Sequence, residues 1–170
     1  MDPAARSLLL LWGFMGSGKS TIGRELAARA GVPFVDLDEA LESRASMSIA
    51  DIFAKRGEPF FRELEKRALE ELLDEGGKAV VALGGGALLD ERLRARSLAD
   101  AFVVTLTAPL EVLQLRLVGK ARPLASRAAA LFEERKSAYL EAHRTVDTSG
   151  DDVGAIVETL LNTWSGWRRG

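Results

Sequence analysis

Residues 13–20, which read GFMGSGKS, decide the fold of this chain. They match the pattern G-x-x-x-x-G-K-[ST] at all of its fixed positions, and an apolar run at residues 8–12 comes directly before them. The glycines allow the backbone to curl around a ligand, so that successive amide N–H groups point inward at an anion. The stretch therefore predicts a buried strand, a phosphate-binding loop and the start of a helix, in that order.

A lysine and a hydroxyl group complete the predicted phosphate site. Lys19 adds a positive charge beside the loop, and Ser20 places a hydroxyl where a Mg²⁺ ion that bridges the outer phosphates of a nucleotide would bind. The alternative is a glycine-rich turn with a surface lysine. The flanking strand and helix favour a nucleotide site, whose candidate residues are Gly16, Ser17, Gly18, Lys19, Ser20 and Thr21.

The composition limits the ligands that the chain can bind. Its 170 residues suffice for one domain, residues 1–170, and 23 basic against 25 acidic residues leave a net charge of −2. No basic field is then available for nucleic acid or an anionic membrane, and the N-terminal apolar run is too short for a signal peptide or a membrane span. The absence of cysteine excludes thiolate chemistry and suits the cytoplasm.

The pattern of apolar residues predicts an α/β fold. Continuous apolar runs alternate with amphipathic segments, which is typical of a parallel sheet covered by helices on both faces. The expected strands are residues 8–12, 32–35, 79–83, 101–106 and 145–147. The expected helices are residues 19–30, 48–57, 59–74, 109–118, 128–139 and a last helix capped by Asp152.

Two acidic residues follow the second expected strand at residues 36–38, which read DLD. Because ligands bind beyond the carboxyl ends of parallel strands, Asp36 and Asp38 are expected beside the phosphate-binding loop. One carboxylate would then organise the water around magnesium, and the other would hold a hydroxyl that must lose a proton. The alternative is that Asp38 is a helix N-cap and Asp36 a solvated turn residue.

Two further features are expected at the same edge of the sheet. Arg62 is placed in the first turn of its helix, where a cation is unfavourable; pairing with Glu58 or Glu65 explains this placement, and a bound anion explains it better. Residues 84–86, three consecutive glycines after a strand, form either a flexible turn or a backbone that approaches a ligand closely.

His143 is the only histidine of the chain. A Ser-His-Asp arrangement built on it stays open, but a lone histidine beside Arg144 favours a helix end or the surface. Trp164 and Trp167 could form a contact patch. Alternatively, Trp164 continues the buried stripe of the last helix, and Trp167 belongs to a loosely held tail.

Taken together, these motifs resemble the shikimate kinase family. The resemblance covers nearly the whole chain and rests on GFMGSGKST, DLD, SIADIF, the FFRELE run with Arg62, VALGGGA, RPL at residues 122–124, the segment 135–139 and VDT. It implies a three-layer α/β/α P-loop kinase fold with a central five-stranded parallel sheet and a mobile lid. It also implies transfer of the γ-phosphoryl group of ATP to a ring hydroxyl of shikimate, with Mg²⁺.

The resemblance also implies roles for the acceptor residues. Asp38 would contact the hydroxyls of shikimate and help the attacking one to lose its proton. Arg62 and Arg135 would bind the carboxylate, and the backbone of Gly84, Gly85 and Gly86 would lie beside the ring. The acceptor region would span residues 38–74 together with these positions.

For the ATP half, the resemblance implies that Ser20 ligates Mg²⁺ and that Asp36 holds its water shell. Arg122 would enter from a lid at residues 119–127 and join Lys19 and Asp38 as a catalytic residue, while Arg116 would lie near the adenine. ATP and shikimate are the expected partners, and we expect a monomer without nucleic-acid or membrane partners.

Other functions fit less well. No N-K-x-D motif indicates a GTPase, no strand ends in the acidic pair of an AAA-type ATPase, and gluconate kinase lacks this glycine triplet with this Arg62 context. A kinase-like domain that senses shikimate or a related acid without turnover is the alternative from another class. The enzyme is favoured because its machinery is present in full, at Lys19, Ser20, Asp36, Asp38 and Arg122.

Overall fold

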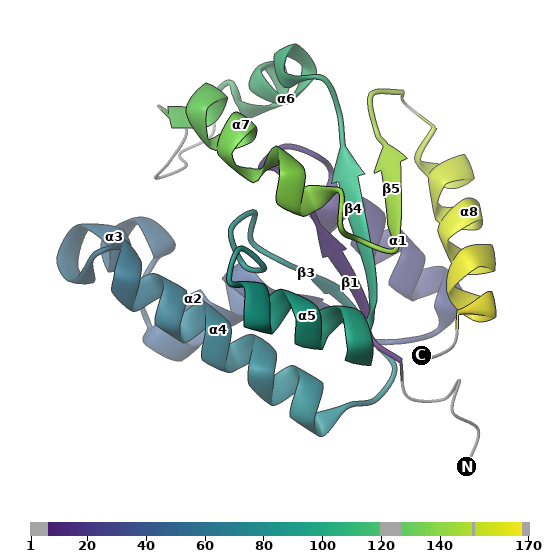
Figure 1. Cartoon of the computed structure of the whole chain (residues 1–170), viewed down its shortest axis with the longest axis horizontal. Helices are drawn as coiled ribbons and strands as arrows, with labels where there is room; N and C mark the ends of the chain where they lie inside the picture. Colours follow the sequence, from purple (N-terminus) through teal and green to yellow (C-terminus); the bar gives the residue numbers. More distant parts are fainter. Residues whose placement is uncertain (1–6, 120–126, 151, 168–170) are drawn as a thin grey trace.

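The computed structural model describes residues 7–119, 127–150 and 152–167 (Figure 1). The strands are β1 (Leu9–Trp12), β2 (Phe34–Asp36), β3 (Val80–Ala82), β4 (Phe102–Thr107) and β5 (Arg144–Asp147). The helices are α1 (Lys19–Ala30), α2 (Leu37–Ala45), α3 (Ile49–Arg56), α4 (Glu58–Glu75), α5 (Glu91–Asp100), α6 (Leu110–Leu117), α7 (Ala128–Tyr139) and α8 (Val153–Gly166).

The strands form one parallel sheet in the order β2-β3-β1-β4-β5. β1 lies in the centre and pairs with β3 on one side and β4 on the other. All the carboxyl ends therefore meet at one edge, where the loop after β1, the start of α2 and the turn after β3 come together. This arrangement confirms the five-stranded parallel sheet that the sequence predicts.

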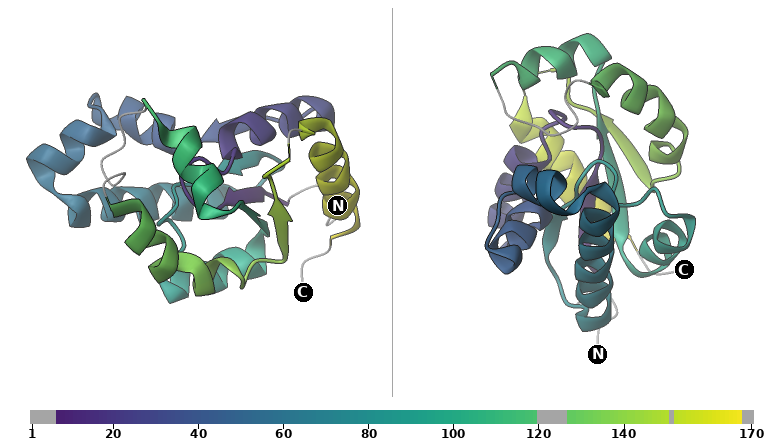
Figure 2. Two further views of the ribbon diagram at one scale, coloured as in Figure 1. Left: turned by 90° about the horizontal axis from the view of Figure 1, so that it is seen from above. Right: turned by 90° about the vertical axis from the view of Figure 1, so that its left-hand side faces the viewer.

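Alternate residues of the central strand face opposite layers. Leu10 and Trp12 pack into a core that also includes Phe61 of α4 and Leu131 of α7. Leu9 and Leu11, by contrast, pack with residues of α1 and α8. Figure 2 shows α1 and α8 side by side on their face of the sheet. Because a strand buried on both faces must be apolar throughout, the run LLLLW becomes the central strand.

The predicted elements are found, and two helices were missed. α2 begins directly after Asp36, and α5 lies between the glycine turn and β4, where the sequence analysis assigned no element. α4 begins at Glu58, so Arg62 lies one turn into the helix, and its placement in the first turn is wrong. Asp36, not Asp38, is the N-cap of α2, so the alternative assignment of the cap is wrong too.

His143 and Trp167 lie away from the shared edge of the sheet. The Nδ1 atom of His143 accepts a hydrogen bond from the backbone N–H of Val103 at 3.0 Å, and its ring stacks on Phe102. Trp167 contacts both of these rings, and Trp164 is buried as predicted. Within the described ranges, no helix is long and apolar enough to cross a membrane.

Candidate functional site: a pocket with two halves

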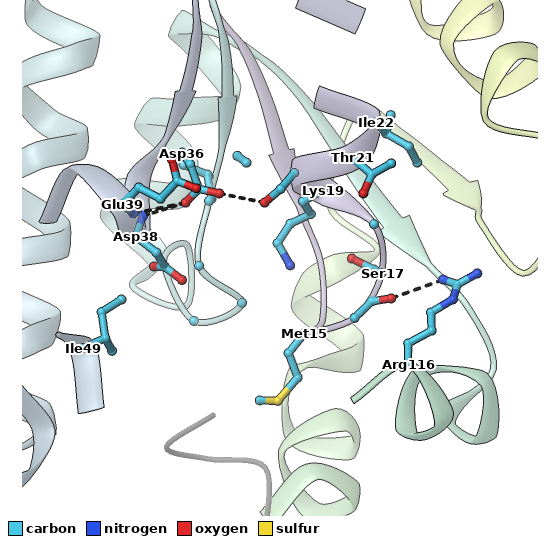
Figure 3. Close-up of a pocket in the computed structure, with 18 of the residues that line it drawn as sticks. Met15, Ser17, Lys19, Thr21, Ile22, Asp36, Asp38, Glu39, Ile49 and Arg116 are labelled. Atoms are coloured by element: carbon cyan, nitrogen blue, oxygen red, sulfur yellow. Dashed lines mark hydrogen bonds between the residues drawn. The ribbon is translucent and has the colours of Figure 1, made fainter. Parts of the chain in front are cut away.

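A pocket of about 850 Å³ opens at the carboxyl edge of the sheet. The phosphate-binding loop and the start of α1 form one side, and the start of α2 and parts of α3 and α4 form the other. Figure 3 shows Lys19 and Ser17 on the first side and Asp36, Asp38 and Glu39 on the second. The three predicted stretches thus meet at the pocket, through residues 15–20, Asp36 and Asp38, and residues 84–86; Arg62, Arg116 and Arg135 also line it.

The phosphate-binding loop has the backbone geometry that its glycines allow. Gly13, Gly16 and Gly18 all have positive φ angles, and Gly18 is the N-cap of α1 without a side-chain cap. The first N–H groups of α1 are therefore left to a ligand, and the positive end of the helix dipole faces the pocket. The Nζ atom of Lys19 donates hydrogen bonds to the carbonyl oxygens of Gly13 at 2.8 Å and Phe14 at 3.0 Å, which fold it over the loop.

Ser20 and Asp36 form an oxygen pair between the halves. The Ser20 hydroxyl donates a hydrogen bond to Oδ2 of Asp36 at 2.7 Å, while Oδ1 of Asp36 accepts from the backbone N–H of Asp38 as the cap of α2. Within the described parts of the chain, no three acidic or histidine side chains are placed so that they could hold a metal ion together. A pair of oxygen donors suits Mg²⁺, which takes most of its ligands from phosphates and water.

Asp38 projects from the first turn of α2 into the space that Lys19 faces from the opposite side (Figure 3). The cap at Asp36 fixes the start of the helix and with it the direction of the Asp38 side chain. A Cβ atom built on Gly84 would lie 3.3 Å from Oδ1 of Asp38, so the carboxylate lies against the glycine turn.

Arg62 is held by two carboxylates of its own helix. Its Nη1 donates to Oε2 of Glu65 at 2.6 Å, and its Nη2 donates to Oε1 of Glu58 at 3.3 Å. Burial disfavours the charge of Arg62, but the two carboxylates outweigh it and raise its pKa. Both pairings that the sequence suggested are present, and the guanidinium still lines the pocket.

Glu65 is a site residue that the sequence analysis named only as a partner of Arg62. Only 2% of its surface is exposed, and its Oε1 has no hydrogen-bond partner within the described ranges. Burial raises the pKa of Glu65 in spite of Arg62. The available signal was a glutamate on the buried stripe of α4, one turn from Arg62 and between Phe61 and Ala68.

Arg135 reaches the pocket from α7. It is 3% exposed, and its Nε has no hydrogen-bond partner in the part of the chain that the structure describes. A buried donor left without an acceptor is costly, so this guanidinium is prepared for an anionic ligand. Arg62 and Arg135 thus approach one pocket from different helices.

The glycine turn lies where side chains would not fit. A Cβ atom on Gly84 would lie 2.3 Å from Oε1 of Glu65, and one on Gly86 would lie 2.6 Å from Cζ of Arg62. Close approach, not flexibility alone, therefore explains the glycines. The polar side chains against the turn include those of Asp38, Arg62 and Glu65, which belong to the side of the pocket that α2 and α4 form.

Arg116 joins the phosphate-binding loop to the segment after β5. Its Nη1 donates to the carbonyl oxygen of Gly16 at 3.2 Å, as Figure 3 shows, and its guanidinium also binds Thr148. The Thr148 hydroxyl donates to the carbonyl oxygen of Ser17 at 2.8 Å. Arg116 therefore lies at the rim of the phosphate-binding half. Arg122 and most of the expected lid at residues 119–127 lie outside the described residues.

A phosphate-binding loop of this geometry, facing paired arginines and a carboxylate across one pocket, defines a P-loop kinase of small molecules. A sequence model described as shikimate kinase matches residues 15–165. The chain belongs to the shikimate kinase family.

Individual relatives agree with this assignment. The shikimate kinase of Geobacter sulfurreducens is 44% identical over 159 residues, which cover 89% of this chain and 87% of the relative. The structure of shikimate kinase from Acinetobacter baumannii in complex with shikimate superposes with a TM-score of 0.84 at 30% identity, covering 93% of this chain and 92% of that one. The structure of the Aquifex aeolicus shikimate kinase superposes with a TM-score of 0.81 at 34% identity, covering 94% of this chain and 96% of that one.

Proposed function

We propose that this protein transfers the γ-phosphoryl group of ATP to a ring hydroxyl of shikimate, giving shikimate 3-phosphate and ADP in the biosynthesis of chorismate and the aromatic amino acids. The observation that carries the proposal is a single pocket in which a phosphate-binding loop faces two arginines and a carboxylate. The loop suits the triphosphate, and the opposite side suits a small acid with hydroxyl groups. Family membership and the shikimate complex of the A. baumannii relative support this choice of acceptor.

In the acceptor half, we assign the carboxylate of shikimate to Arg62 and Arg135. Two planar guanidinium groups match the geometry of a carboxylate, and the carboxylate would supply an acceptor to the buried Nε of Arg135. Asp38 then accepts the proton of the attacking hydroxyl while the hydroxyl oxygen bonds to the γ-phosphorus. The backbone of Gly84, Gly85 and Gly86 borders the ring.

In the donor half, the backbone of Gly16, Ser17 and Gly18 and the side chain of Lys19 bind the phosphates of ATP as the oxygen bridging the β- and γ-phosphorus atoms departs with ADP. Thr21, which also lines the pocket, belongs to this half, and Arg116 borders it. Ser20 and Asp36 would hold Mg²⁺, directly and through water respectively. The ion would offset the charge that develops on the phosphate oxygens.

The remaining parts of the proposal rest on the sequence. Residues 1–170 form one kinase domain whose acceptor region spans residues 38–74, and residues 119–127 act as a lid that carries Arg122 to the transferred phosphoryl group. We also propose a cytoplasmic monomer, in keeping with the cysteine-free composition.

ADP formation is the direct test. Purified protein with ATP and Mg²⁺ is expected to release ADP only when shikimate is added, with one ADP for each shikimate phosphorylated, followed in a coupled assay. Omission of Mg²⁺ is expected to abolish turnover. Binding of shikimate without turnover would instead support the sensor and refute the enzyme.

Arg62→Ala tests the carboxylate site. Hydrogen bonds to charged groups contribute about 1.5–3 kcal/mol, so the shikimate KM is expected to rise about 10-fold to 100-fold while the ATP KM changes less than about threefold. Arg67→Ala is the matched control, because Arg67 lies on the same helix, is exposed and pairs only with Glu63 among the described residues. In Arg62→Ala the buried Glu65 loses its ion-pair partner, so a thermal melt measures how much stability this loss costs. Equal rises in both KM values would refute the assignment.

A further inference from the structure

Two side-chain donors meet at one backbone oxygen beside the acceptor half. The indole Nε1–H of Trp12 donates to the carbonyl oxygen of Gly85 at 3.1 Å, and the Tyr139 hydroxyl donates to the same oxygen at 2.9 Å. Trp12 is the last residue of β1, and Tyr139 is the last residue of α7. A carbonyl oxygen has two lone pairs, so the two donors together use its whole capacity.

The two donors also support each other. Their rings are in edge-to-face contact with centroids 4.7 Å apart, which restricts the rotation of both side chains. Trp12 is fully buried at 0% exposure, and its N–H acts only as a donor. Burial raises the pKa of Tyr139 to about 12, so its hydroxyl keeps its proton at neutral pH. Both groups therefore stay donors under working conditions.

The oxygen that they bind belongs to a turn without side chains of its own. Gly84, Gly85 and Gly86 border the pocket, and three successive glycines allow many backbone conformations. Every peptide bond of the described backbone is trans, so the N–H of Gly86 points opposite to the carbonyl of Gly85. Fixing that carbonyl fixes the direction of the N–H, away from Trp12 and Tyr139.

We infer that Trp12 and Tyr139 are positioning residues for the acceptor, because together they hold the Gly85 carbonyl so that the adjoining peptide N–H is directed at the bound ring. This inference rests on the proposed function and deepens its acceptor half. Neither side chain lines the pocket. Trp12 acts through the glycine turn, and Tyr139 acts through the same turn while its hydroxyl also bonds with Arg135.

Because Trp12 adjoins the phosphate-binding loop, the ATP KM serves as an internal control for changes in the shikimate KM. Trp12 directly precedes Gly13, and a Cβ atom on Gly85 would lie 3.3 Å from the carbonyl oxygen of Gly13. A change that merely loosened the packing of β1 would disturb the phosphate-binding loop as well as the glycine turn. A change confined to the Gly85 carbonyl would affect the acceptor alone.

The experiment removes each donor while keeping an aromatic ring at its position. Trp12→Phe and Tyr139→Phe are each expected to raise the shikimate KM, and the shikimate Kd measured by calorimetry, about threefold to tenfold, as loss of one neutral hydrogen bond predicts. The ATP KM is expected to stay within about twofold. Tyr139→Phe loses only an oxygen atom, but that oxygen also bonds with Arg135, so a rise that Trp12→Phe shows as well is what assigns the effect to the Gly85 carbonyl.

The double variant and a control complete the test. With both donors gone, the Gly85 carbonyl has neither side-chain partner, and because both donors act on one oxygen, the rise in the shikimate KM is expected to differ from the product of the single rises. Trp164→Phe is the matched control: it removes an indole hydrogen bond to Ser7 in the other core and should change neither KM.

The outcomes separate this inference from the proposed function. Wild-type protein that neither binds nor phosphorylates shikimate would overturn both. The positioning role alone would be overturned if the wild-type protein phosphorylates shikimate and the single variants leave the shikimate KM unchanged. It would also be overturned if they raise the shikimate KM and the ATP KM equally. A double variant whose rise equals the product of the single rises would show that the two donors act independently, and it would also overturn the positioning role.

Discussion

Asp38→Asn is expected to lower kcat about 1,000-fold, within the range of about 100-fold to 10,000-fold that general bases contribute. The amide keeps the size of the side chain and its place in the first turn of α2, but it accepts no proton from the attacking hydroxyl. The ATP KM is expected to change less than about threefold, because Lys19 and Ser17 of the phosphate-binding loop, to which we assign the phosphates, lie across the pocket from Asp38 (Figure 3). Steady-state kinetics with both substrates varied checks both values.

Asp51→Asn is the control for this prediction. Asp51 also lies in the first turn of a helix, α3, but it is exposed and lies outside the pocket lining. Loss of a carboxylate near a helix N-terminus costs about 0.3–1 kcal/mol of stability at either position, so the two variants should melt alike. A loss of ATP affinity as large as the loss of turnover would show that Asp38 belongs to the donor half.

Most elements that the sequence predicts share a clear apolar pattern, which the missed helix α5 lacks. β1 and β3 are continuous apolar runs, and α8 keeps a helical period. α5 buries Arg94 and Ser97 beside Leu93, so its inner face does not read as apolar. Arg94 is accommodated because it donates to the carbonyl oxygen of Leu88 and pairs with Glu141, contacts that depend on the folded chain.

α2 was missed for a different reason. Its N-cap is Asp36, which the sequence analysis assigned to the magnesium site, and the helix begins at the next residue without a loop. One carboxylate does both: Oδ1 caps the helix while Oδ2 accepts from Ser20. A local pattern shows a cap or a ligand, and only the folded structure shows that one side chain is placed for both.

In the candidate site, too, local sequence patterns were predictable, and contacts between distant elements were not. Residues 13–20, 36–38 and 84–86 were predictable because each follows a strand and parallel strands end at one edge. The polar contacts between elements were not predictable. Trp12 and Tyr139 lie 73 and 54 positions from Gly85, and nothing in their neighbouring residues indicates that their donors meet at one oxygen.

Gly13→Ala is expected to cost about 3–5 kcal/mol of folding free energy, as the sum of backbone strain and overpacking. Gly13 has a φ angle of +135°, and a Cβ atom there would lie 2.2 Å from the carbonyl oxygen of Leu106. The sheet explains this contact: Trp12 pairs with Thr105, so the loop leaves β1 directly against the backbone of β4. Neither backbone can retreat without breaking the central pairing.

Gly31→Ala separates the clash from the strain of a positive φ angle. Gly31 has a φ angle of +66° at the end of α1, and nothing lies within 4 Å of a Cβ atom built there. Its substitution should therefore cost only the left-handed conformation, about 1–2 kcal/mol. Urea unfolding measures both variants, and the midpoint of Gly13→Ala should fall well below that of Gly31→Ala. Equal midpoints would mean that the phosphate-binding loop moves to accommodate the added methyl group, so that the packing of Gly13 on β4 does not fix the position of the loop.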